Sequence, residues 1–147
     1  MIRRLIITLF LSSLVGITSS FAPDPIREDI QAFINKWWNV PYVYGGASMR
    51  GIDCSAFTQR FYKEIFDKKI PRTARSQYHA MTSVPKDSIQ TGDLVFFSSK
   101  LSPSGWHVGI YLWNDSFVHA ANRRDDIKIS ALSNSFYQKT FKGAKRL

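Results

Sequence analysis

The chain contains a single cysteine, Cys54, and three histidines, and these residues are its candidates for nucleophilic chemistry. Asp53 is a good helix N-cap residue, and apolar residues recur at helical spacing after Cys54, so Cys54 lies in the first turn of a predicted helix. The unpaired N–H groups and the dipole at that end favour an anion, which here would be a thiolate. Free cysteines are also often buried as small hydrophobic residues, so this position alone does not establish catalysis.

A cysteine nucleophile needs a base, and the base needs a third group that fixes its tautomer and orientation. His107 opens one predicted strand and His119 ends the next. Either histidine alone could instead be a half-buried structural residue. Together with a cysteine at a helix start, the two histidines match the set of nucleophile, base and orienting group. His79 lies within a predicted surface helix and is given no role.

A zinc site formed by Cys54, His107 and His119 is a further alternative, because a catalytic zinc needs only three such ligands. No His-x-x-x-His or Cys-x-x-Cys pair supports it. The sequence therefore predicts neither a metal site nor a cofactor.

Hydrophobic periodicity predicts the elements that must position these residues. Helices are predicted over 24–38, 54–67 and 73–81. They are followed by strands over 94–97, 107–113, 116–120 and 127–132, a short helix over 134–141 and a last strand over 143–147. Because the helices come first and the strands second, the predicted class is α+β, with the helices packed on a mostly antiparallel sheet of about five to six strands.

The predicted hairpin between His107 and His119 does not by itself bring their rings together. A two-residue turn at Asn114 and Asp115 places the two histidines on opposite faces of the hairpin. A three-residue loop that ends at Ser116 restores one face but leaves the histidines four positions apart. Under either register, a bulge or a strong twist would be needed.

The first 20 residues have the pattern of a secretory signal peptide. Two arginines precede an almost continuous apolar run over 5–17, and small residues follow it, so we expect cleavage after Ser20 or Ala22, with Ser20 preferred. An uncleaved signal anchor is the alternative. Residues 23–147 are predicted to form one domain that is monomeric and has no stable membrane anchor, since no cysteine stands at the end of the segment to carry a lipid. The single cysteine also excludes an intrachain disulfide.

The formal net charge of +9 favours an anionic partner. An exported basic protein meets little nucleic acid, so cell-wall polymers and anionic membrane surfaces are the better candidates. The basic residues are scattered along the chain, which is also typical of a surface kept basic for solubility.

Six short motifs follow one another between residues 38 and 147: Tyr-x-Tyr-Gly-Gly, Gly-x-Asp-Cys-Ser, Pro-Arg, Gly-Asp-Leu-Val-Phe-Phe, His-Val-Gly-Ile-Tyr and Phe-Val-His-Ala. In this order and spacing they resemble the NlpC-type family of bacterial cell-wall cysteine peptidases, and single-domain murein endopeptidases in particular. The resemblance implies a papain-like core, in which a cysteine at a helix N-terminus faces histidines from a packed sheet. It also implies hydrolysis of peptide bonds in peptidoglycan.

By this resemblance Cys54 is the nucleophile, His107 is the base that later acts as an acid, and His119 orients His107. Tyr42 matches a tyrosine whose hydroxyl lies beside the thiolate and helps to bind the oxyanion. The backbone N–H of Cys54 would be the second donor of that oxyanion hole.

The residues around the nucleophile have more than one possible role. Asp53 is expected to cap the helix rather than act as an acid, and its charge opposes thiolate formation. Ser55 and Arg72 are candidate substrate contacts, with capping and surface pairing as their alternative roles. The family commonly has glycine where this chain has Ala56, which affects the expected local helix packing and not the chemistry.

The predicted function is that of an exported peptidoglycan endopeptidase of the periplasm or cell envelope, or a secreted one if the host has no outer membrane. The bond cut is either the D-Ala to diaminopimelate cross-link, which the resemblance favours, or the D-Glu to diaminopimelate bond within one stem. One alternative is a non-catalytic wall-binding module with Tyr42, Trp37, Trp38 and Trp106 around a groove. Another is an amidase or acyltransferase on the same scaffold.

Overall fold

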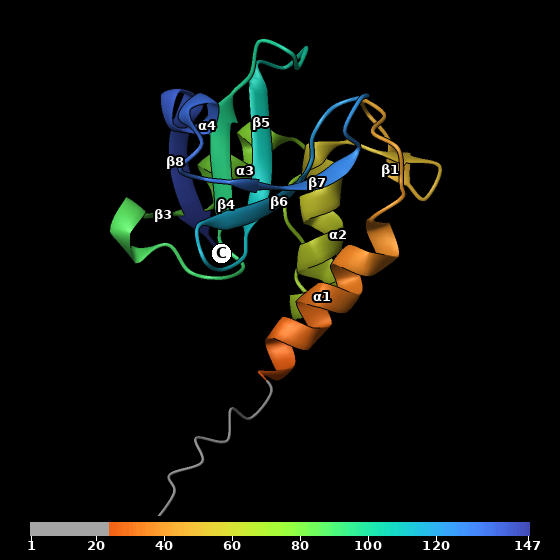
Figure 1. Cartoon of the computed structure of the whole chain (residues 1–147), viewed down its shortest axis with the longest axis horizontal. Helices are drawn as coiled ribbons and strands as arrows, with labels where there is room; N and C mark the ends of the chain where they lie inside the picture. The colour runs from red at the N-terminus through yellow and green to blue at the C-terminus, as the bar shows by residue number, and fades with distance from the viewer. Residues whose placement is uncertain (1–23) are drawn as a thin grey trace, which may run out of the picture.

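The computed structural model describes residues 24–147 (Figure 1). The predicted signal peptide and its cleavage after Ser20 or Ala22 lie outside the described residues. Within residues 24–147, no helix is long and apolar enough to cross a membrane.

Three helices form the first half of the described chain, close to their predicted ranges. Helix α1 covers Pro25–Trp37, α2 covers Cys54–Phe66 and α3 covers Ala74–Ala80. Each begins after a residue whose side chain accepts a backbone hydrogen bond from the first turn: Asp24, Asp53 and Thr73. Such caps satisfy N–H groups that have no partner within the helix, which is why the helices start at these residues.

The second half of the chain forms a six-stranded antiparallel sheet, which confirms the predicted α+β class. The strands lie in the order β3-β8-β4-β5-β6-β7. Their bounds are β3 Thr82–Val84, β4 Leu94–Ser98, β5 Trp106–Tyr111, β6 Ser116–Ala120, β7 Ile127–Ala131 and β8 Phe141–Arg146. The remaining elements are the helix α4 Ser135–Thr140, the 3-10 turn η1 Lys86–Ser88 and the small hairpin of β1 Ala47–Ser48 and β2 Gly51–Ile52.

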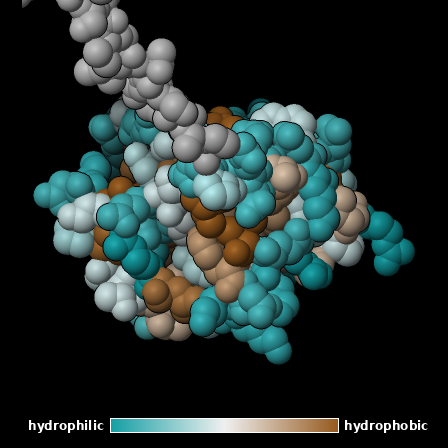
Figure 2. Space-filling view, turned by 90° about the horizontal axis from the view of Figure 1, so that it is seen from below, coloured by the Kyte–Doolittle hydropathy of each residue, from teal (hydrophilic) through white to brown (hydrophobic). Residues whose placement is uncertain are grey.

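Both faces of this sheet are covered, and β4 shows how. Leu94 and Phe96 join the large core between the sheet and helices α1 and α2, which lie side by side in Figure 1. Val95 and Phe97 join a second cluster on the other face, where Tyr137 of α4 packs. A strand that is buried on both faces has a continuous run of apolar residues in its sequence, as β4 does. On the face shown in Figure 2, a hydrophobic patch lies near the centre, and smaller hydrophobic areas are scattered toward the edges among hydrophilic residues.

The register of the β5–β6 hairpin differs from both predicted registers. Tyr111 pairs with Phe117, and the Leu112 N–H donates to the Ser116 carbonyl at 2.8 Å. The loop is therefore three residues long, but it starts one residue earlier than predicted, at Trp113. The two residues that follow, Asn114 and Asp115, adopt positive φ angles of 49° and 61°. Asn and Asp tolerate this left-handed conformation better than other side chains do, which explains how the chain turns here.

This register is compatible with the two histidines lying on the same face of the hairpin. If it is continued along the hairpin, His107 lies opposite Ala121, two residues from His119 and on the same face. Gly109 lies between them on that face, and a Cβ atom there would come within 2.5 Å of Cδ2 of Phe117. The missing side chain lets the Phe117 ring pack against His119, with 4.7 Å between the ring centroids. The paired part of this hairpin is only two residue pairs long, and in Figure 1 β6 runs across β5, so a strong twist accompanies the contact between the histidines, as the sequence led us to expect.

Candidate active site

Cys54 is the first residue of α2, as predicted, and it is buried, with 6% of its surface exposed. Asp53 caps the helix through its Oδ1 atom, which accepts from the Ala56 N–H at 2.8 Å. The N-terminal part of β5 packs close by, because Val108 of β5 and Cys54 belong to the same core cluster, and the Val108 backbone N–H acts to lower the pKa of the Cys54 thiol. Val108 follows His107 in the chain, so the strand that carries His107 reaches the start of the helix that carries Cys54.

The thiol of Cys54 is protonated at neutral pH, contrary to the expectation from its position at a helix end. Burial raises its pKa to about 12, and the charge of Asp53 also acts to raise it. Backbone N–H groups of Val108, Ser55 and Cys54 itself lower the pKa but do not offset the burial. Burial comes from tertiary packing, and it outweighs the favourable helix end.

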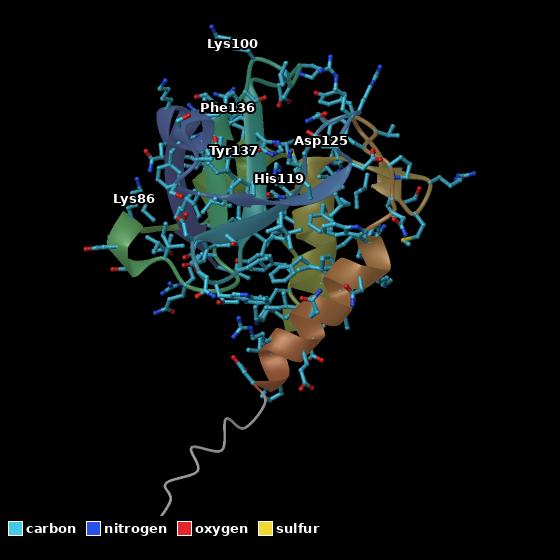
Figure 3. The ribbon with its side chains drawn as sticks, in the orientation of Figure 1. Lys86, Lys100, His119, Asp125, Phe136 and Tyr137 are labelled. Atoms are coloured by element: carbon cyan, nitrogen blue, oxygen red, sulfur yellow. The ribbon has the colours of Figure 1, made fainter. Side chains whose placement is uncertain are left out.

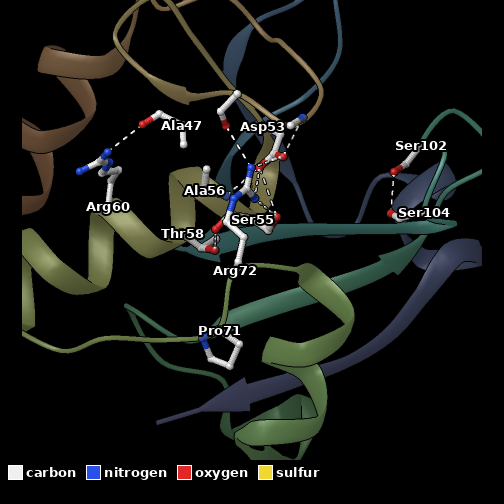
Figure 4. Close-up of polar contacts among 12 residues, drawn as sticks. Ala47, Asp53, Ser55, Ala56, Thr58, Arg60, Pro71, Arg72, Ser102 and Ser104 are labelled. Carbon is white, nitrogen blue, oxygen red and sulfur yellow. Dashed lines mark hydrogen bonds and ion pairs between the residues drawn. The ribbon is translucent and has the colours of Figure 1, made fainter.

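Asp53, which precedes Cys54 in the chain, lies at the centre of a polar network (Figure 4). Its two oxygens bind the Arg72 guanidinium with two hydrogen bonds, of 2.9 and 2.8 Å. The Ser55 hydroxyl donates to Oδ1 at 3.2 Å and the Gly45 N–H donates to Oδ2 at 3.0 Å. Arg72 Nη1 also donates to Ser55 Oγ at 3.0 Å, and its bond to Asp53 raises the pKa of the guanidinium. The predicted candidates Ser55 and Arg72 are therefore held together by the cap of α2.

Replacing Asp53 with alanine should lower the free energy of unfolding by roughly 2–3 kcal/mol, because the helix cap and the partner of the Gly45 N–H are lost together. Urea unfolding followed by circular dichroism measures the change. Asp24→Ala is the matched control, since Asp24 caps α1 without an ion pair. Equal losses in the two variants would show that the Asp53 network adds nothing beyond an ordinary cap.

The structure brings His107 and His119 into direct contact, with His107 Nε2 2.7 Å from His119 Nδ1. Only 9% of His107 and 1% of His119 are exposed. On its other side, His119 Nε2 lies 3.0 Å from Ser130 Oγ and 3.4 Å from the Tyr137 hydroxyl. Figure 3 shows His119 and Tyr137 as neighbours.

These contacts are compatible with one proton arrangement that leaves a basic nitrogen on His107. If His107 Nε2 carries the proton and donates to His119 Nδ1, then His107 Nδ1 is free to accept one. His119 must then carry its own proton on Nε2, where the Ser130 and Tyr137 hydroxyls can accept it. Sequence reasoning missed Ser130 and Tyr137. Only the register of β7 against β6, in which Ser130 pairs with Phe117, could have indicated Ser130.

Both imidazoles are neutral at neutral pH. Burial lowers the pKa of His107 to about 4. Burial also lowers the pKa of His119 well below its usual value, and the charges of His107 and Lys128 act in the same direction.

We expect the stability of the fold to fall as the pH drops from about 6.5 to about 4. In that range the unfolded chain binds protons on His107 and His119, while the folded chain holds both rings neutral, at a cost of up to about 1.4 kcal/mol per pH unit for each ring. Urea unfolding at several pH values measures the slope. His107→Gln should flatten it, whereas His79→Gln, at an exposed position, should not. An equal slope in the wild type and His107→Gln would contradict the prediction.

Tyr42 borders the thiol and is fixed by its backbone. Its N–H donates to Asp126 Oδ1 at 2.9 Å, and it forms a parallel bridge with Ile52. Burial raises the pKa of the Tyr42 hydroxyl to about 12, and the charges of Cys54 and Asp53 also raise it. The hydroxyl therefore keeps its proton and can donate a hydrogen bond at neutral pH.

Two adjoining hollows form a cleft over these residues. A hollow of about 270 Å³ is lined by Cys54, Ser55 and Arg72, and one of about 490 Å³ by His107 and the turn that follows β6. They share Tyr42, Tyr44 and Ser102. We name them the cysteine half and the histidine half of the cleft.

The aromatic groove suggested for a wall-binding module is not formed by the predicted tryptophans. Trp37 is buried in the core beside Phe57, and Trp106 packs against Tyr78. None of the three tryptophans lines the cleft. Of the four aromatic residues suggested for the groove, only Tyr42 lines it. Within residues 24–147 there is also no group of three or more His, Cys, Asp or Glu side chains arranged to hold a metal ion, so the zinc alternative has no ligand cluster there.

Known proteins are similar to this chain in sequence and fold. The sequence pattern of the NlpC/P60 family matches residues 39–146. A probable endopeptidase of Haemophilus influenzae is 40% identical over 113 residues, which are 77% of this chain and 70% of that protein. The murein DD-endopeptidase MepS/murein LD-carboxypeptidase of Escherichia coli is 39% identical over 111 residues, or 76% of this chain and 57% of that protein.

The fold of a solved structure agrees with these matches. An NLP/P60 family protein of Staphylococcus aureus, described as similar to a lipoprotein, has a TM-score of 0.74 and 33% identity. The match covers 90% of this chain and 45% of that one. With its antiparallel sheet, its cysteine at a helix start and the family pattern along most of its length, the chain belongs to the NlpC/P60 family.

Proposed function

We propose that this protein is a cysteine endopeptidase that hydrolyses peptide bonds in peptidoglycan. The observation that carries the proposal is that Cys54, at the start of α2, and His107, which is hydrogen-bonded to His119, line two hollows that share Tyr42, Tyr44 and Ser102. The relatives named as probable or murein endopeptidases support the substrate class.

In the proposed reaction, Sγ of Cys54 attacks the carbonyl carbon of the scissile bond while Nδ1 of His107 takes the thiol proton. A resting thiolate is not required. With a thiol pKa of about 12 and an imidazole pKa of about 4, the neutral pair is favoured, so the proton moves as the carbon–sulfur bond forms. His119 accepts from Nε2 of His107 and holds the ring in the tautomer that can receive the proton.

The oxyanion that forms would be stabilised by the Tyr42 hydroxyl and the backbone N–H of Cys54. His107 then gives the proton to the leaving amine, which departs and leaves a thioester on Cys54. Water, activated by His107, hydrolyses the thioester and restores the thiol. Ser55 and Arg72 line the cysteine half of the cleft, and we propose that they contact the acyl side of the substrate.

We further propose that the protein is exported to the periplasm or cell envelope and acts there as a monomer. The support is the sequence pattern of residues 1–20 and the location of the proposed substrate. Apart from water and the substrate, the reaction above uses only side chains and backbone groups of this chain.

Digestion of purified peptidoglycan, followed by mass analysis of the released muropeptides, tests the function. Wild-type protein should release fragments cut within the peptides, and Cys54→Ala should release none. Products cut between glycan and peptide would instead identify an amidase. Binding to peptidoglycan without products from either protein would identify a wall-binding module. Activity that survives Cys54→Ala would contradict the thiol mechanism.

A further inference from the structure

The histidine half of the cleft has a cationic wall. It is lined by Arg123 and Arg124, which are exposed and follow β6 in the chain. Neither forms an ion pair with a carboxylate among residues 24–147. Arg123 is near enough to Tyr42 that its charge acts to lower the pKa of that hydroxyl.

The one carboxylate that lines this half of the cleft is already engaged. Asp125 Oδ2 lies 3.1 Å from the Lys128 ammonium and accepts from the Asn122 side-chain amide at 3.0 Å. The main cationic partner of Asp125 is therefore Lys128, which lies outside the cleft lining, while the charge of Arg124 also acts to lower the pKa of this carboxyl. The wall as a whole keeps a positive charge that faces a hollow large enough for part of a peptide.

The turn that carries the arginines is held in place by hydrogen bonds. The Arg124 N–H donates to Asn122 Oδ1 at 2.9 Å, and the Asp126 N–H donates to the Asn122 carbonyl, also at 2.9 Å. Asp126 in turn accepts from the Tyr42 N–H. The backbone that carries the two guanidinium groups is thus anchored to Tyr42, and Figure 3 labels Asp125 in the same turn.

The chemistry of acyl transfer decides which part of the substrate meets this wall. His107 must return its proton to the leaving amine, so the amine side of the scissile bond lies over His107, in the same half of the cleft as the arginines. The acyl side then lies in the cysteine half. A positive wall at the amine side favours a leaving group that carries a negative charge close to its nitrogen.

We propose that Arg123 and Arg124 form a carboxylate subsite for the leaving group, which makes the enzyme selective for peptide bonds to an amine whose own carbon carries a free carboxylate. The inference rests on the proposed function and deepens it. At the D-Ala to diaminopimelate cross-link the amine belongs to such a carbon. At the D-Glu to diaminopimelate bond of a stem, the adjacent carboxyl group continues into the next peptide bond. The subsite therefore selects the cross-link.

Two matched substrates test the subsite: a cross-linked muropeptide dimer with a free carboxylate next to the scissile amine, and the same dimer with that group as a carboxamide. We expect the wild type to show kcat/KM at least about ten-fold higher for the carboxylate, since charge-assisted hydrogen bonds are markedly stronger than neutral ones. The double variant Arg123→Gln, Arg124→Gln should lose most of that factor on the carboxylate substrate and little on the amide. Lys68→Gln, Lys69→Gln, at exposed positions outside the cleft lining, makes the same change of charge and should leave the ratio unchanged.

Three outcomes would overturn the subsite while leaving the endopeptidase function intact. The wild type could cleave the two dimers at equal rates, or the arginine double variant could lose the same factor on both dimers. The main product could also come from cleavage of the D-Glu to diaminopimelate bond within a stem. If the wild type cleaved neither dimer, the proposed function would fail, and binding would still decide the subsite. Calorimetry with Cys54→Ala should then show tighter binding of the carboxylate dimer than of the amide, and the preference should disappear in Cys54→Ala, Arg123→Gln, Arg124→Gln. Equal affinity of Cys54→Ala for the carboxylate dimer and the amide dimer would refute the carboxylate subsite.

Discussion

Replacing His107 with alanine is expected to lower kcat/KM on peptidoglycan peptides by on the order of 10³-fold or more, because the Cys54 thiol would then have no base. The buried thiol, with a pKa of about 12, cannot ionise without help at neutral pH, so the loss should be as severe as that in Cys54→Ala. Initial rates on a purified cross-linked muropeptide measure it.

The double variant Cys54→Ala, His107→Ala separates this explanation from simple damage to the fold. Residues that act as one unit give non-additive effects, so the double variant should be no slower than either single one. His79→Ala is the control for loss of an imidazole, since His79 is exposed on α3 and lies outside the cleft lining. A His107→Ala protein that folds normally and keeps more than about a tenth of the wild-type rate would exclude His107 as the base.

Replacing Tyr42 with phenylalanine should lower kcat by about 10²-fold with little change in KM, because the lost hydroxyl would act on the oxyanion and not on the bound substrate. The high pKa of this hydroxyl keeps its proton in place for donation, so the effect should be constant between pH 6 and 9. Steady-state kinetics at several pH values measures it.

Tyr44→Phe is the matched control for Tyr42→Phe, because Tyr44 lines the same cleft but is half exposed. It should change KM at most. A Tyr42→Phe enzyme with unchanged kcat and a raised KM would show that Tyr42 binds the substrate and takes no part in oxyanion stabilisation.

Local sequence signals were sufficient for the helices, the longer strands and the Asp53 cap. The apolar residues of α1 recur at helical spacing, and Asp53 marks the start of α2, so both helices could be placed to within a residue or two. The strands of two or three residues, β1, β2 and β3, were missed because segments so short have no periodicity. The start of the β5–β6 loop was misplaced by one residue, because the left-handed pair Asn114 and Asp115 is compatible with several loop lengths.

The environment of the site was less accessible to sequence reasoning. The helix position of Cys54 predicts a lowered thiol pKa, whereas burial, which depends on packing between residues distant in the chain, raises it. Ser130 and Tyr137 reach His119 from β7 and α4 only after both hairpins have set their registers. No motif marks either residue, so the hydroxyls behind His119 follow from tertiary structure alone.

The division of the site between the helical half and the sheet half of the chain has a consequence for the cell that makes this protein. Cys54 comes from the helices and His107 from the sheet, and neither segment contains the partner that the proposed chemistry requires. A chain that is still being synthesised, or is held unfolded, would carry a thiol and imidazoles but no peptidase. Completion of folding would thus be the step that creates the proposed activity.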